Sequence, residues 1–543
     1  MRNLFGERGR HPYADRIEAD RIAQGDSPKQ AFKAGALGRQ VTVTGVDLVF
    51  RPQPSVYLLW ALGDEETRRV IEAAHERAIE RVLEWIEDEV AVIRYGKDGI
   101  YRVRPPGGLV AARFRHHEAR SGRPLLHDHL LLSVKGQRLD GKWGSSHTLA
   151  LHENTVAVSA LYNELVMAEV CEELGLASEP REVTPGLRPV MEIAGVDQEL
   201  IDWSSTRRRR IEDVLEGITD EYVKKHGRLP GERARHGLGW WAAQETRPDK
   251  KTPRPLDQLL AWWRVSALLK FGHRMVDGLL QRCQAAGAAI RARVGPWVDT
   301  ALAAVDVAAV VFTVRGIFAR RHVLAEARRH LLETLRGRAF TRGLDDYIAD
   351  AALSRHSRQL TVPQKDRQAP APDQLTHTAD FAWPHRWWIA GTGGKPPRES
   401  SRYERARVAS LALQNAIRDA RISSTRDEAP TAAAPHAVAH PDRAAALTPA
   451  QRAAAIQAHQ QAAMPEAYLG GRTTDAATWL RTPENLYRLA ALTAQPTPAA
   501  APSRTGRPRP PARPDRSTGP ARSTSSTSCP AETKTKAASR DVP

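Results

Sequence analysis

Four histidines lie in one short stretch of the chain, Leu109–Val134, which reads LVAARFRHHEARSGRPLLHDHLLLSV. Two segments of alternating apolar and polar residues flank a polar loop, a pattern typical of two β-strands joined by a turn. Successive side chains of a strand point to opposite faces, so His127 and His129 share one face of the second strand. Antiparallel pairing across Glu118–Leu126 would place His116 of the first strand beside them.

Three imidazoles on rigid strands suit a divalent metal ion with an open coordination position, as metal-assisted chemistry requires. The alternative is that they are ordinary strand histidines, because a His-x-His pair on a strand often binds no metal. The spacing alone leaves both interpretations open.

This stretch and its flanks resemble the TrwC/MobF family of conjugative relaxases, which are single-stranded DNA transesterases of the HUH type. The family motif is a histidine, then a loop that ends in a Pro-x-Leu-His-x-His strand. It is matched here by His116, Pro124, Leu126, His127 and His129.

Three further segments follow the family pattern, so the resemblance covers Leu4 to Lys251. The upstream segment GVDLVFRPQPSV resembles the family's Gly-aromatic-Asp-Leu-Thr-Phe strand and contains Asp47. Downstream lie the turn Asp140–Trp143 and a helix that contains Tyr162.

The resemblance implies an α+β domain with an antiparallel sheet and helices on one face. It implies that His116, His127 and His129 bind a divalent metal ion such as Mg²⁺ or Mn²⁺, and that Asp47 orients one of these histidines. The implied activity is site-specific nicking and strand transfer of single-stranded DNA at a transfer origin. Relaxosome accessory proteins and a coupling protein are the further partners that it implies.

Relaxases of this family carry a nucleophilic tyrosine on a segment well upstream of the aspartate strand. Asp47 comes early in this chain, so we expect that the tyrosine segment is lacking. Tyr13 is not expected to replace it, because it lies in a charged helix start and a phenol must be positioned beside the metal-bound phosphate.

Two other functions therefore stay open: a catalytically inactive, truncated relaxase that binds DNA, and a metal-water phosphodiesterase. The second would use Asp47 or Glu118 as the general base. The helicase common in the family is not expected, because Gly391–Lys395 is followed by Pro396 where a P-loop needs serine or threonine. We therefore expect no nucleotide.

The formal charge of +17 favours a polyanionic partner, although codon bias toward arginine would have the same effect. The four arginines Arg207–Arg210 are candidate DNA contacts, but a solvated helix start is the favoured interpretation. The pairs Trp240-Trp241 and Trp262-Trp263 could stack on bases, yet such pairs in helices are expected to lie in the core.

We predict five parts: a truncated N-terminal helical linker (1–40), the relaxase-like α+β domain (41–251), a helical region (252–360), a linker with short helices (361–424) and an Ala/Pro/Arg-rich, mostly disordered tail (425–543). Val41–Phe50 and Val56–Leu62 are expected to be strands, TALAAVDVAAVVFTV a buried helix, and Pro449–Met464 a short helix. Three cysteines without a CxxC pair, and no apolar run long enough to span a bilayer, predict a cytoplasmic protein.

Overall fold

A computed structural model describes residues 10–36, 45–95, 101–181, 183, 188–249, 252, 254–360, 375–382, 402–426 and 448–461. The segment Gly391–Lys395, Cys529 and the tail beyond residue 461 lie outside these residues.

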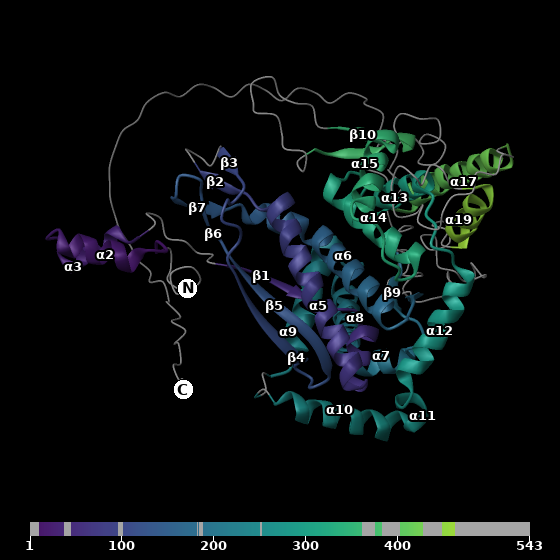
Figure 1. The fold of residues 1–543 in the computed structure, drawn as a ribbon, viewed down its shortest axis with the longest axis horizontal. Coiled ribbons are helices and arrows are strands. Elements are labelled where there is room, and N and C mark those ends of the chain that lie inside the picture. The colour runs from purple at the N-terminus through teal and green to yellow at the C-terminus, as the bar shows by residue number, and fades with distance from the viewer. Residues whose placement is uncertain are drawn as a thin grey trace, which may run out of the picture. The chain divides into compact units, whose positions relative to one another are not determined.

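A three-stranded antiparallel sheet carries the histidine motif (Figure 1). Its strands are β1 (Gly45–Phe50), β5 (Pro124–Ser133) and β4 (Ala111–Glu118), in that order across the sheet. The predicted antiparallel pairing of the two histidine strands is confirmed, with a bulge at the end of β4 that leads into the loop.

Helices cover one face of this sheet (Figure 1): α4 (Pro54–Leu62), α5 (Glu65–Trp85) and α6 (Thr148–Glu173). On β5, Leu126, Leu130 and Leu132 are buried against them, whereas the histidines between these leucines face outward. The strand therefore alternates between a core face and an open face. The predicted α+β class, with helices on one face of an antiparallel sheet, is confirmed.

The prediction of a strand at Val56–Leu62 was wrong, because this segment forms α4. Pro54 occupies its first turn, where the missing N–H costs nothing. Every residue from Ser55 to Leu62 is buried, so the helix has no polar face. A short run that is apolar all round cannot be distinguished from a buried strand by its periodicity.

A second, four-stranded sheet follows the order β3-β2-β7-β6 and is built from two hairpins. The first joins β2 (Ile93–Tyr95) to β3 (Tyr101–Val103), and the second joins β6 (Lys135–Gln137) to β7 (Trp143–Ser146). Gly141 has a φ of 75° in the second turn, a conformation that favours glycine.

The chain has further described elements within its first 300 residues. They are α2 (Ala14–Ala23), α3 (Pro28–Ala34), a π-helical turn η1 (Ile86–Val90), β8 (Ser178–Arg181), β9 (Val190–Ile193), α7 (Gln198–Ser204), α8 (Thr206–His226), α9 (Glu232–Glu245), α10 (Leu256–Phe271), α11 (His273–Val276) and α12 (Leu279–Arg293). Trp263 of α10 and Cys283 of α12 belong to the same apolar core as the leucines of β5.

A second apolar core is formed by α13 (Thr300–Arg315), α14 (Arg320–Leu335), α15 (Leu344–His356) and α17 (Arg402–Arg426). Beside it lie β10 (Ser357–Gln359), β11 (His377–Ala379), a 3₁₀ turn η4 (Asp380–Ala382) and α19 (Pro449–Gln461). The predicted buried helix and the predicted helix after residue 449 are confirmed as α13 and α19. Among the described residues, no helix is both long and apolar enough to cross a membrane.

Candidate metal centre

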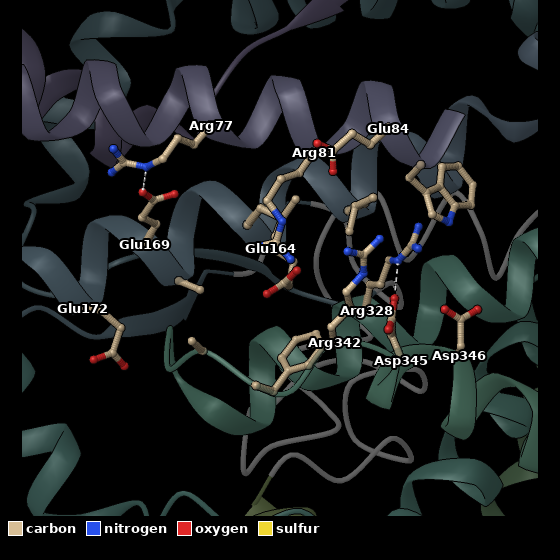
Figure 2. Close-up of a pocket in the computed structure, with 17 residues that line it drawn as sticks. Arg77, Arg81, Glu84, Glu164, Glu169, Glu172, Arg328, Arg342, Asp345 and Asp346 are labelled. Atoms are coloured by element: carbon tan, nitrogen blue, oxygen red, sulfur yellow. Dashed lines mark hydrogen bonds and ion pairs between the residues drawn. The ribbon is translucent and has the colours of Figure 1, made fainter. Parts of the chain in front are cut away.

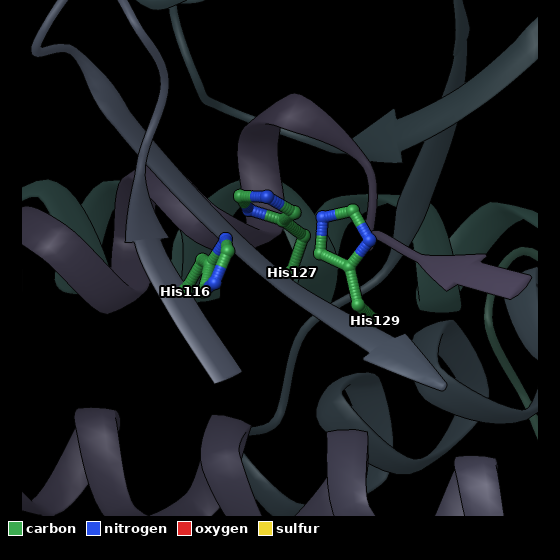
Figure 3. A group of neighbouring side chains, drawn as sticks. All are labelled: His116, His127 and His129. Carbon is green, nitrogen blue, oxygen red and sulfur yellow. The ribbon is translucent and has the colours of Figure 1, made fainter. Parts of the chain in front are cut away.

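The side chains of His116, His127 and His129 converge on the open face of the three-stranded sheet (Figure 3). His116 and His127 are direct partners in the β4–β5 register, and His129 follows two residues later on the same face. The ring centroids are 5.0–5.3 Å apart, and one nitrogen from each ring lies within 4.8 Å of the others. The spacing in the sequence thus brings the three rings together through strand pairing alone.

Hydrogen bonds orient two of these rings. His127 Nδ1 lies 2.9 Å from the carbonyl oxygen of Leu125, and His129 Nδ1 lies 2.9 Å from Asp47 Oδ2. Because each Nδ1 donates its proton to an oxygen, the Nε2 atom of each ring carries the lone pair. Asp47 reaches His129 from the neighbouring strand β1, where it is half exposed.

Burial, with a smaller contribution from the neighbouring His116 and His129, lowers the pKa of His127 to about 4. The ring is therefore neutral at pH 7, which is the form that binds a metal ion. Three imidazoles, one of them oriented by a carboxylate, form a donor set that fits a divalent ion with an open position.

Asp128, between the two β5 histidines, points to the opposite face and is fully buried. Its carboxylate accepts hydrogen bonds from Arg113 and Arg115 of β4, and His75 of α5 lies 3.1 Å away. Burial alone would raise the pKa of Asp128, but hydrogen bonds and charge from His75 and Arg115 hold it well below its ordinary value. This ionic cluster fixes the strand that carries the site.

Contacts with α10 hold the loop between β4 and β5. Trp263 Nε1 donates a hydrogen bond to the carbonyl oxygen of Gly122 at 2.8 Å, and Arg254 lies 2.9 Å from the carboxylate of Glu118. Next to His116, His117 stacks on the buried Trp60 with ring centroids 5.7 Å apart. His117 is therefore a packing residue, and its ring points away from His127 and His129.

Two exposed apolar side chains flank the site. Phe114 and Val49 are the partners of His129 on its two neighbouring strands, so all three side chains share one face. Phe114 and Val49 are each 54% exposed. The alternation of residues along β4 predicts that Phe114 lies on the histidine face. It does not predict that the ring is exposed.

Tyr13 is the residue that precedes α2, and its ring is 52% exposed. It packs edge-on against Trp143 of β7, with ring centroids 6.2 Å apart. This contact places Tyr13 on the four-stranded sheet, not on the sheet that carries the histidines.

The arginines Arg207–Arg210 occupy the first turn of α8. Arg207 donates hydrogen bonds to the carbonyl oxygens of Ala243 and Thr246 at the end of α9, and Arg209 pairs with Asp202. The side chain of Arg208 lies outside the described part of the chain, and Arg210 is exposed. Two of these four guanidinium groups therefore already have protein partners.

The expectation that both tryptophan pairs lie in the core was wrong for three of the four residues. Trp263 is fully buried, whereas Trp240 and Trp241 of α9 are 65% and 48% exposed and Trp262 is 39% exposed. Arg123 and Arg254 lie over the ring of Trp262 in cation–π contacts. In α9, Ala242 is buried, whereas the two tryptophans just before it remain at the surface.

A separate pocket lies between α5, α6 and the segment that joins α14 to α15 (Figure 2). Basic and acidic side chains alternate around it, and Arg328 pairs with Asp345 at 2.8 Å. Burial raises the pKa of Glu164 in its wall to about 8. Because its wall carries both acidic and basic side chains, the pocket favours neither an anion nor a cation.

Residues 1–268 match the family model described as TrwC relaxase. Similar solved structures include a metal-bound conjugative relaxase TrwC in complex with oriT DNA (27% identity over 41% of this chain and 71% of that chain, TM-score 0.34). A metal-free structure of TrwC with oriT DNA is 26% identical over 48% of this chain and 83% of that chain, with a TM-score of 0.35. A copper-bound structure is 26% identical over 47% of this chain and 79% of that chain, with a TM-score of 0.34. No curated protein matches the chain. Through residues 1–268, this chain belongs to the TrwC relaxase family.

Proposed function

We propose that this protein is a relaxase that binds single-stranded DNA at a transfer origin and acts on one phosphodiester bond beside a divalent metal ion. The convergence of His116, His127 and His129 on the open sheet face of a TrwC relaxase domain carries this proposal. Accessory proteins of the relaxosome, a coupling protein and a cytoplasmic location are part of the same proposal.

The three Nε2 atoms would hold the ion, which when bound withdraws charge from the scissile phosphate. Asp47 keeps His129 in the tautomer that presents Nε2, and the carbonyl oxygen of Leu125 does the same for His127. The buried cluster around Asp128 holds both histidines in place from beneath. These residues position and orient the site.

Exposed rings near the site suit unpaired bases. Phe114 stands beside His129 on the open face, and stacking of a base on an aromatic ring is tolerant of sequence. Trp240 and Trp241 offer further exposed rings, and the charge of +17 favours a polyanion. This combination of stacking surface and positive charge is typical of proteins that bind single-stranded nucleic acid.

The metal-water phosphodiesterase is less well supported, because both candidate general bases have partners. Asp47 accepts the hydrogen bond of His129, and Glu118 is paired with Arg254. A general base must be able to reach the water whose proton it takes. Neither carboxylate is available without loss of its present contact.

The test is an analysis of products with the full chain. Labelled oligonucleotides that tile the DNA beside the gene are incubated with the protein and Mn²⁺, then separated on denaturing gels for cleavage and on protein gels for covalent adducts. A cleaved strand attached to the protein through tyrosine supports the relaxase proposal, and tryptic mapping of the adduct identifies the nucleophile.

Cleavage without an adduct would establish the metal-water mechanism in its place. Binding of the oligonucleotides without cleavage would establish the DNA-binding alternative. Failure to bind any oligonucleotide, with or without Mn²⁺, would overturn the proposal as a whole.

A further inference from the structure

We propose that Asp306, His330 and His459 form a second, structural site for a divalent metal ion of the zinc class. The three residues come from α13, α14 and α19, which lie far apart in the sequence. One ligand atom from each lies within 4.8 Å of the others. All three side chains are buried, with residue exposures of 4%, 2% and 5%.

The donor set suits zinc. Imidazole nitrogen and carboxylate oxygen are both common zinc ligands, and structural sites are closed to solvent. The rings of His330 and His459 are 5.0 Å apart, and His330 Nδ1 lies 2.7 Å from Asp306 Oδ2.

One buried nitrogen points independently to a ligand. His459 Nε2 has no hydrogen-bond partner among the described residues, although it is sequestered from solvent. A buried polar atom without a partner is destabilising. A metal ion would supply the missing partner.

The cluster lies among other buried charged groups. Asp306, Glu326 and Glu333 are buried and share one buried guanidinium, that of Arg188. Arg329, which is half exposed, reaches Glu326 from outside.

A metal ion at this cluster would hold α19 in place. This helix has 13 residues, a length that is marginal in isolation, and its apolar contribution is a small cluster of Ile456 with Leu302 and Ala420. Arg452 adds an ion pair with Asp299 at 3.2 Å. A metal bound by His459 would fix α19 to α13 and α14, because binding energy at a structural site adds directly to folding energy.

The experiment measures zinc by mass spectrometry in the purified full chain after dialysis against excess zinc and then buffer. It uses a background in which His116, His127 and His129 are all replaced by alanine, so that the open site cannot contribute. We expect about one equivalent of zinc in this background and none after the additional change His459→Ala. Gln457→Ala, an exposed change on the same helix, should retain the full equivalent.

A second measurement does not depend on the His459→Ala change. Removal of zinc from the same background by a chelator should increase hydrogen exchange in Pro449–Gln461, and added zinc should restore protection. Absence of zinc from the triple-alanine background, or an unchanged zinc content after His459→Ala, would overturn the proposal.

Discussion

The two histidine clusters of this protein use similar donors in opposite settings. His116, His127 and His129 project from neighbouring strands onto an open sheet face, whereas Asp306, His330 and His459 are enclosed between three helices. An open face leaves room for a phosphate beside a bound ion, and an enclosed cluster does not. The comparison shows that the surroundings of a donor set, more than its composition, decide whether it can serve chemistry or stability.

The largest expected effect is at the open cluster. Replacement of His127 by alanine removes a ligand, so the affinity for Mn²⁺ should fall by more than roughly 100-fold, because loss of an orienting partner alone costs 10–100-fold. Titration calorimetry measures this affinity. The control His152→Ala, an exposed change on α6, should leave this affinity unaltered. An unchanged affinity in His127→Ala would show that the open cluster does not bind the ion.

Asp128→Asn should destabilise the sheet beneath the open cluster by about 3–5 kcal/mol, because it removes the buried carboxylate that Arg113, Arg115 and His75 contact. The depressed pKa of Asp128 means that its stabilisation is present above the ordinary carboxyl value and is lost as the pH falls through the lower folded value. Urea unfolding from pH 7 to pH 3 should therefore show acid lability that is weaker in the variant.

Asp140→Asn is the matched control, because that carboxylate is exposed and pairs with Arg138 on a turn. Equal unfolding midpoints for Asp128→Asn and the wild type would show that the inner face does not support the site.

Asp47→Asn should weaken metal binding at the open cluster by about 10–100-fold while the fold is retained. The amide keeps the size of the carboxylate but stabilises the tautomer of His129 less well. The zinc content at the enclosed cluster should not change, which makes this variant a direct comparison of the two sites.

Phe114→Ala should lower the affinity for a short single-stranded oligonucleotide by about 1–3 kcal/mol, the usual contribution of one stacked base. Fluorescence anisotropy measures it. Leu139→Ala removes a side chain that is 82% exposed on a turn and should have no effect. Equal losses in both variants would argue against a stacking role for Phe114.

The smallest effect is expected at α8. Replacing Arg207 and Arg209 by serine should change the salt dependence of DNA binding less than replacing Arg210 does. Arg207 already contacts a carbonyl oxygen of α9, and Arg209 already pairs with Asp202. A large loss of salt slope in the double variant would show that these contacts open when DNA binds.

The open cluster could be predicted from the sequence because its residues are local. His116, His127 and His129 lie on two consecutive strands, and the period of two assigns each to a face. The hydrogen bond between His129 and Asp47 needed the family pattern, because β1 is distant in the chain.

The enclosed cluster had no such signal. His330 and His459 lie on separate helices, with no spacing that links them to each other or to Asp306. The helix α4 and the exposed tryptophans of α9 were missed for a related reason. Whether an apolar segment is buried on all sides or left at the surface depends on packing partners elsewhere in the chain.

The central claim is that the open histidine cluster holds a metal ion that engages single-stranded DNA. Its most direct test is the affinity for a labelled oligonucleotide from beside the gene, measured with and without Mn²⁺ in the wild type and in the His116, His127 and His129 triple-alanine variant. We predict that Mn²⁺ strengthens binding in the wild type and has no effect in the variant. Equal dependence on Mn²⁺ in both proteins would contradict the claim.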